Sequence, residues 1–173
     1  MVHKKDEFHN VQPLKLTREA YKELAHHTEI CLPFEACGIL VGSSPDKLDR
    51  FIPVTNVSQN PLHHFSLHPA EWTSLLLGGM PVQGLYHSHP SSPPVPSSED
   101  LNQLGSFAGL FTSYLIAGIK APASVQQHGQ KPELTLTSYW IRENTSTSPA
   151  SYQSHPSGFT WSLEETRLVL HES

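Results

Sequence analysis

Cysteine is rare in this chain, which has only Cys31 and Cys37 among its 173 residues. Small secreted domains that depend on disulfides carry a much denser set of cysteines, so the sequence disfavours that class. A bridge between Cys31 and Cys37 stays possible in principle. Because Cys37 lies in a short apolar run, we expect a reduced thiol in the core and disfavour a nucleophilic role for it.

Positive charge and long apolar runs are also scarce. The chain has 11 Lys and Arg against 16 Asp and Glu, a formal net charge of −5, which disfavours a nucleic-acid-binding surface. The segment from Met1 to Glu7 is charged and lacks the apolar stretch of a signal peptide. Later apolar stretches are too short to span a bilayer. We therefore expect a soluble, cytoplasmic protein that contacts neither nucleic acid nor membrane.

Helical and strand-like segments are mixed along the chain, which predicts an α/β fold with a single mixed β-sheet flanked by helices. Thr17 is the expected N-cap of the first helix, and Pro69 fits the first turn of the second. Helices are predicted at 17–29, 69–77 and 98–107. Strands are predicted at 38–42, 50–56, 82–87, 113–119 and 134–141, with a further short strand at 65–67.

Composition divides the chain into four segments. Residues 1–13 are expected to be an N-terminal extension, and residues 14–143 to form the main domain. Residues 144–158 are dominated by Ser, Thr, Pro and Asn, which predicts a flexible excursion because such a segment buries little apolar area. Residues 159–173 regain apolar character. We expect them to pack on the domain as a strand and a short helix, or to contact a partner subunit.

The most informative pattern is His87-Ser88-His89-Pro90, followed by Ser97 and Asp100. Two histidines one residue apart on a strand point to the same face, so both imidazoles can reach one ion. Asp100 could close the site from the start of the next helix. The same residues also have a purely structural explanation, in which a strand is followed by a proline loop and by a helix capped by Ser97. That explanation does not account for why two histidines and an aspartate occur together. The pattern predicts a metal site with three protein ligands.

Glu35 is the best acid to accompany such a site. A catalytic zinc ion with three protein ligands keeps its fourth position for water, and a carboxylate must take the proton of that water. Glu35 lies just before the apolar run Cys37–Val41. Taken alone it would be interpreted as an ordinary exposed loop residue. The metal motif favours the catalytic interpretation.

Together, Glu35-Ala36-Cys37-Gly38-Ile39-Leu40, His87-Ser88-His89-Pro90, Ser97 and Asp100 resemble the JAMM motif of the Mov34/MPN/PAD-1 metalloprotease family. The resemblance implies a layered, cytidine-deaminase-like architecture and one zinc ion per chain with a catalytic water. It implies that His87, His89 and Asp100 bind zinc, that Glu35 acts on the water, and that Ser97 steadies the oxyanion. Every motif position is occupied, so the chain resembles the active members and not the metal-free scaffold members.

The resemblance also implies the reaction class, a zinc-dependent peptidase or isopeptidase. Deubiquitinases of the family carry insertions around the catalytic loop, and the spans 65–82 and 100–132 are too short for them. The chain therefore resembles the compact prokaryotic members. The substrate so implied is a small ubiquitin-like or sulfur-carrier protein with a Gly-Gly tail, from which a C-terminal cysteine or other extra residues would be removed.

Two alternatives stay open. One is a non-catalytic MPN-type interaction or scaffold domain with a structural zinc ion, which intact Glu35 and Ser97 disfavour because a structural site fills its fourth position with a protein ligand. The other is a DNA-repair or phage-associated protein with the same fold, which the acidic charge balance disfavours. The remaining histidines of the ordered segments are expected at a helix end or on the surface, namely His26, His27, His63, His64 and His68.

Overall fold

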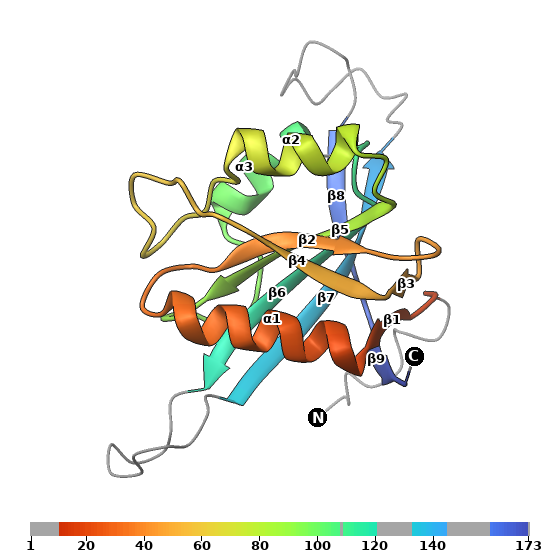
Figure 1. The fold of residues 1–173 in the computed structure, drawn as a ribbon, viewed down its shortest axis with the longest axis horizontal. Helices are drawn as coiled ribbons and strands as arrows, with labels where there is room; N and C mark the ends of the chain where they lie inside the picture. The colour runs from red at the N-terminus through yellow and green to blue at the C-terminus, as the bar shows by residue number, and fades with distance from the viewer. Residues whose placement is uncertain (1–10, 108, 121–132, 145–159, 173) are drawn as a thin grey trace, which may run out of the picture.

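The structure is a computed structural model that describes residues 11–107, 109–120, 133–144 and 160–172. Residues 1–10 of the expected N-terminal extension and 145–158 of the expected excursion lie outside the described residues. Helix α1 covers one face of the main sheet, and helices α2 and α3 lie on the opposite face (Figure 1). A smaller group of strands, β1, β3 and β9, lies at one end of α1 (Figure 1).

The main sheet has six strands in the order β4-β2-β5-β6-β7-β8. Strands β5 and β6 pair in parallel, and every other pair in this sheet is antiparallel. This confirms the predicted mixed sheet. The strands are β2 (Cys37–Val41), β4 (Arg50–Val54), β5 (Val82–His89), β6 (Ser113–Lys120), β7 (Glu133–Asn144) and β8 (Thr160–Thr166).

A second sheet corrects the expectation of a single one. It contains three parallel strands in the order β3-β1-β9. Strand β1 (Leu14–Thr17) lies between β3 (Lys47–Leu48) and β9 (Leu168–His171). Residues 159–173 were expected to pack as a strand and a short helix, but their described part forms two strands, β8 and β9, and β9 pairs with β1 over its whole length. Tertiary pairing with a distant segment therefore overrides the local pattern.

The three helices agree with the predicted ones in place and type. They are α1 (Arg18–Cys31), α2 (Pro69–Leu77) and α3 (Ser98–Phe107). The side chain of Thr17 accepts a hydrogen bond from the backbone N–H of Ala20 at 3.1 Å, which confirms it as the N-cap of α1. The predicted strand at 65–67 is reduced to an isolated bridge between Asn56 and Leu67.

Alternation along β5 separates two cores. Leu85 packs into the apolar cluster on the side of α2 and α3, whereas Tyr86 packs into the cluster under α1. Successive side chains of a strand point to opposite faces, so His87 and His89 follow Leu85 onto the side of α3, and Ser88 follows Tyr86. This alternation sets which layer of the fold holds the metal motif.

Candidate metal centre and active site

The two histidines of the motif lie at the end of β5, in the middle of the sheet. His87 is opposite Cys37 of β2 and Ile116 of β6, and His89 is opposite Gly118 of β6. His87 is fully buried, and His89 is 5% exposed. Their Nε2 atoms are 2.8 Å apart. The predicted convergence of both imidazoles on one face of the strand is confirmed.

Asp100 reaches the same point from the first turn of α3. Its Oδ2 accepts hydrogen bonds from the backbone N–H and the hydroxyl of Ser97, each at 2.7 Å, and its own N–H donates to Ser97 Oγ at 3.1 Å. This reciprocal arrangement is a capping box with aspartate in place of glutamate. The predicted cap by Ser97 is confirmed, and it fixes the carboxylate of Asp100.

His87, His89 and Asp100 form a group that could hold one metal ion. Nε2 of His87 is 3.3 Å from Oδ1 of Asp100, and Nε2 of His89 is 3.4 Å from Oδ2. Around a tetrahedral zinc ion with bonds of about 2.0–2.1 Å, ligand atoms are about 3.3–3.4 Å apart. The two distances to the carboxylate, which end on different oxygens, match this spacing, whereas the 2.8 Å between the two Nε2 atoms is shorter. The donor set of two imidazole nitrogens and one carboxylate oxygen is also one that zinc accepts.

Contacts on the far side of each ring orient the two histidines. Nδ1 of His89 lies 2.8 Å from the carbonyl oxygen of Pro93. A carbonyl can only accept, so Nδ1 carries a proton and Nε2 is the ring atom that faces Asp100 and His87. The ring of His87 is held by packing, stacked on Phe65 at 4.5 Å and edge-on to Tyr114 at 5.4 Å between centroids.

Glu35 lies in the loop between α1 and β2 and is only 5% exposed, so the interpretation as an ordinary exposed acid is wrong. Its backbone N–H donates to the carbonyl of Pro61 at 2.7 Å, and its carbonyl accepts from Asn56 Nδ2 at 3.0 Å. Its carboxylate interacts electrostatically with His89 and Asp100. The fold therefore brings together the acid and the metal group that the sequence separates by some fifty residues.

Ser88, between the two histidines, is a site residue that the sequence analysis missed. Its hydroxyl accepts a hydrogen bond from the backbone N–H of Ala36 at 2.9 Å, and its N–H donates to the Ala36 carbonyl at 2.9 Å. The strand that carries the two histidines thus also holds the residue after Glu35. The sequence did hold a signal for this role: Ser88 is a polar residue in a strand predicted to be buried, and a buried hydroxyl needs a hydrogen-bond partner.

Burial dominates the charge state of Glu35. It raises the pKa of Glu35 to about 7, against the opposing effect of the imidazole of His89 and with a further increase from the charge of Asp100. Burial would also raise the pKa of Asp100, but hydrogen bonds from His87, His89 and Ser97 outweigh it and hold that pKa well below its usual range. The metal-free site thus holds one firmly ionised carboxylate and one that titrates near neutrality.

For the metal-free protein, we expect Glu35 to lower the free energy of unfolding as the pH rises from about 4.5 to about 7. Over this interval the unfolded chain releases the proton of Glu35 while the folded chain keeps it, so ionisation favours the unfolded state. The decrease is at most about 3.5 kcal/mol, because one pKa unit corresponds to about 1.4 kcal/mol. Urea unfolding of the wild type and Glu35→Gln across this range measures it. Parallel curves for the two proteins would contradict the raised pKa.

The two cysteines are free, and Cys37 is buried. The thiol of Cys37 donates to the carbonyl of Val54 at 3.4 Å, and burial raises its pKa to about 12. The predicted reduced core thiol is confirmed. His27 differs from the expected solvated helix end, because it is half-buried and its ring contacts Phe51 at 5.7 Å between centroids.

The family model for prokaryotic homologs of the JAB domain, Prok-JAB, matches residues 17–129, a range that includes all five predicted site residues. The chain belongs to the Prok-JAB family. The resemblance to the JAMM/MPN motif is thereby confirmed at the level of the family. No helix among the described residues of this JAB-family chain is long and apolar enough to cross a membrane.

Two curated proteins are similar to parts of this JAB-family chain. The Desampylase of Haloferax volcanii is 41% identical over 73 residues, which are 39% of this chain and 52% of that protein. The Tail tip assembly protein K of Escherichia phage N15 is 32% identical over 77 residues, which are 44% of this chain and 30% of that protein. The chain thus matches about half or less of the length of these relatives.

Solved structures support the JAB fold over nearly the whole chain. Protein DSY2949 from Desulfitobacterium hafniense has a TM-score of 0.57 and 26% identity, covering 92% of this chain and 94% of its own. AF2198, a JAB1/MPN domain protein from Archaeoglobus fulgidus, has a TM-score of 0.50 and 22% identity, covering 93% and 100%. The second likeness concerns the fold alone.

Proposed function

We propose that the chain is a zinc-dependent peptidase or isopeptidase that hydrolyses an amide bond at the C-terminal tail of a ubiquitin-like or sulfur-carrier protein. The observation that carries the proposal is the convergence of ligand atoms of His87, His89 and Asp100 within 4.8 Å of one another, with the buried Glu35 beside them. The partial match to a protein named Desampylase supports the same reaction class.

The protein groups have separate tasks in this reaction. A zinc ion held by His87, His89 and Asp100 would polarise the amide carbonyl and acidify a water molecule. Glu35 takes a proton from the attacking water and returns it to the leaving amine. A pKa near neutrality suits a group that must both accept and donate a proton at physiological pH.

Ser97 is proposed to donate to the oxyanion that forms at the amide carbon. Its side chain is exposed at the start of α3, yet its single hydroxyl proton points to Asp100 in this structure. Donation to a substrate requires that hydroxyl to rotate. Asp100 would keep the hydrogen bond from the backbone N–H of Ser97, so the rotation leaves the carboxylate oriented. One such donor typically contributes about 3 kcal/mol to transition-state stabilisation.

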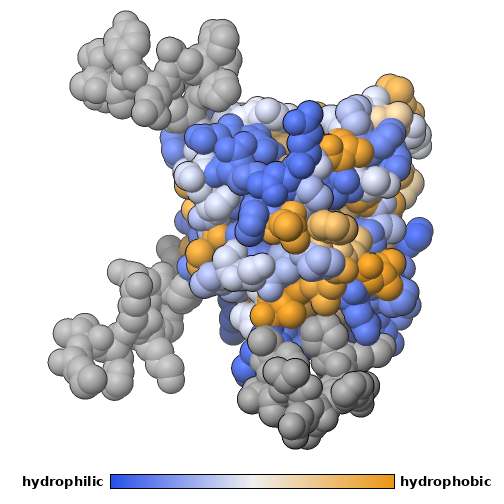
Figure 2. All heavy atoms as spheres, turned by 90° about the vertical axis from the view of Figure 1, so that its left-hand side faces the viewer, coloured by the Kyte–Doolittle hydropathy of each residue, from blue (hydrophilic) through white to orange (hydrophobic). Residues whose placement is uncertain are grey.

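The surface beside Glu35 suits a protein substrate. Hydrophobic side chains gather on the side of the molecule where α1 ends (Figures 1 and 2). Ile30, Leu32 and Phe34 are 64%, 38% and 46% exposed, and with Glu35 they line a hollow of about 460 Å³. An exposed apolar patch next to a polar site is typical of a surface that binds another macromolecule. This supports a folded protein as the substrate and not only a short peptide.

Mass spectrometry of a tailed substrate tests the proposal. The zinc-loaded chain is incubated with a ubiquitin-like sulfur carrier whose Gly-Gly tail is extended by cysteine or by a short peptide. We expect the mass of the carrier to fall by that of the extension. A carrier whose two tail glycines are replaced by valine serves as control, because the larger side chains would obstruct a narrow approach to the site. No mass change with either carrier would contradict the proposed substrate.

A further inference from the structure

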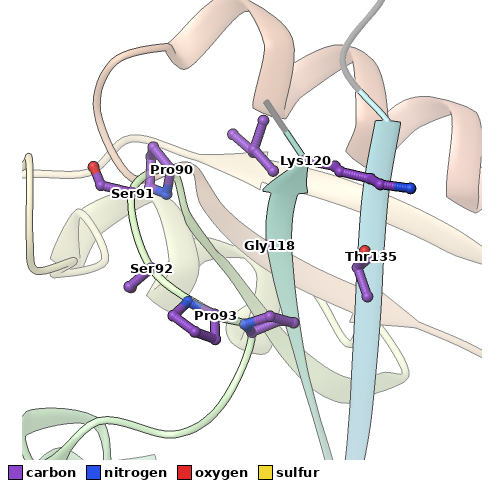
Figure 3. Close-up of a pocket in the computed structure, with 9 residues that line it drawn as sticks. Pro90, Ser91, Ser92, Pro93, Gly118, Lys120 and Thr135 are labelled. Atoms are coloured by element: carbon purple, nitrogen blue, oxygen red, sulfur yellow. The ribbon is translucent and has the colours of Figure 1, made fainter. Parts of the chain in front are cut away.

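The loop that follows the metal strand packs tightly against its neighbour, β6. Residues Pro90–Pro94 and the end of β6 border a hollow of about 400 Å³, and the loop passes alongside β6 where Gly118 lies (Figure 3). Gly118 is also the residue of β6 that pairs with His89. The same glycine therefore adjoins both the second histidine of the motif and the loop that comes after it.

A side chain on Gly118 would collide with the ring of Pro94 in this loop. A Cβ atom placed there would lie 2.6 Å from Cδ of Pro94, 3.1 Å from its Cγ and 3.2 Å from its backbone nitrogen. Real Cβ atoms essentially never come within 3.0 Å of another heavy atom in this way. Because the Cδ atom of proline is bonded to the backbone nitrogen, the ring cannot move aside without moving the chain. Gly118 thus allows Pro94 its present position.

Pro94 in turn sets the direction of the Pro93 carbonyl. The backbone N–H of Val95 donates to the Pro93 oxygen at 2.8 Å, so Pro94 is the central residue of a three-residue turn. The same oxygen lies 2.8 Å from Nδ1 of His89. A displacement of Pro94 rotates or shifts the carbonyl that orients the imidazole. The line of contact runs from Gly118 through Pro94 and Pro93 to His89.

We propose that Gly118 is a positioning residue for the metal site: its lack of a side chain lets the Pro93–Val95 turn hold the imidazole of His89 in the tautomer that presents Nε2 to the metal. This inference rests on the proposed metal site. Mutations that remove a partner orienting a ligating histidine typically lower metal affinity by about 10–100-fold. Gly118 has no side chain that could bind the ion or the substrate. It therefore acts on the metal site only through the loop.

Gly118→Ala is expected to weaken zinc binding by about 10–100-fold, as measured by competition with a chromogenic chelator. In the metal-free protein, ¹⁵N-labelled imidazoles give a second readout by NMR. The wild type should show a slowly exchanging Nδ1 proton for His89, assigned by its absence in His89→Gln. Gly118→Ala should lose that protected proton. An affinity and a proton signal that both stay unchanged in Gly118→Ala would overturn the inference.

Two further variants separate positioning from general damage to the fold. Thr135→Ala alters the residue opposite Gly118 in β7, which lines the same hollow, and should leave the affinity and the His89 signal unchanged. Adding Pro94→Ala to Gly118→Ala removes the two ring carbons that collide and should restore both. Failure of this rescue in a double variant that unfolds like the wild type would overturn the inference.

The two proposals fail in different ways. A wild-type protein that does not bind zinc would contradict the proposed metal site. Even in that case, the Nδ1 proton signal of His89 can be compared between the metal-free wild type and Gly118→Ala. That comparison decides whether Gly118 acts on the imidazole through the loop.

Discussion

Glu35→Gln should lower the rate of amide hydrolysis by about 10²–10⁴-fold, the usual contribution of a general base, while the protein keeps its metal. The amide of glutamine has nearly the size and shape of the carboxyl group that it replaces, but it cannot take a proton from water. Because Glu35 is 5% exposed and held by backbone hydrogen bonds to Pro61 and Asn56, the substitution should leave the loop in place. The measurement is kcat/KM together with zinc content by elemental analysis.

Glu19→Gln is the matched control, since Glu19 lies on the exposed first turn of α1 and should tolerate the change without loss of turnover. A Glu35→Gln protein that hydrolyses the substrate at the wild-type rate would exclude Glu35 as the base. A wild type that binds the carrier and zinc but never cleaves, with Glu35→Gln behaving identically, would instead favour an interaction domain with a structural metal.

The double substitution His87→Ala, His89→Ala should remove the metal altogether. Two of the three ligands are lost, and the remaining carboxylate of Asp100 cannot hold zinc by itself. Zinc content should fall from about one ion per chain to near zero, and hydrolysis with it. The stabilisation by zinc should vanish as well, which amounts to about 4 kcal/mol when free zinc is 1,000 times the dissociation constant. Elemental analysis and urea unfolding with and without zinc measure both effects.

His63→Ala, His64→Ala provides the control of equal composition, because these histidines belong to the loop before α2 and lie outside the metal group. It should keep its zinc and its stabilisation by zinc. A wild type that takes up no metal after zinc addition would contradict the proposed catalytic zinc site. A His87→Ala, His89→Ala protein that retains its zinc would contradict it as well.

The metal motif could be predicted from the sequence because its geometry is mostly local. Alternation along one strand places His87 and His89 on one face, and a capping box over four residues places Asp100. The role of Glu35 could be predicted only with the metal motif, which requires a carboxylate, and with the family resemblance, because taken alone Glu35 would be interpreted as an exposed loop residue. Its place near the metal group depends on how β2 pairs with β5.

The features that the sequence analysis missed are those in which the partners lie far apart along the chain. The bond from Ala36 to Ser88 spans 52 residues, and the contact between Gly118 and Pro94 depends on the parallel register of β5 and β6. The second strand at the C-terminal end, β9, was not predicted because its residues carry no signal of their partner, β1. Hydrophobic pattern constrains which face of an element is buried, but it says little about which element will cover it.

The central place of β1 in the three-stranded sheet has a consequence for the order in which the chain can fold during synthesis. The hydroxyl of Thr166 donates to the carbonyl of Gln12, which lies 154 residues earlier, and β1 then pairs with β9. At about 5–20 residues per second, a ribosome needs roughly 8–30 s to make the chain between them. Strand β1 lacks β9 until the end of that interval, by which time every residue of the metal motif has been made. The closing of this small sheet is therefore the latest of the strand pairings to become available, and it joins the two ends of the fold.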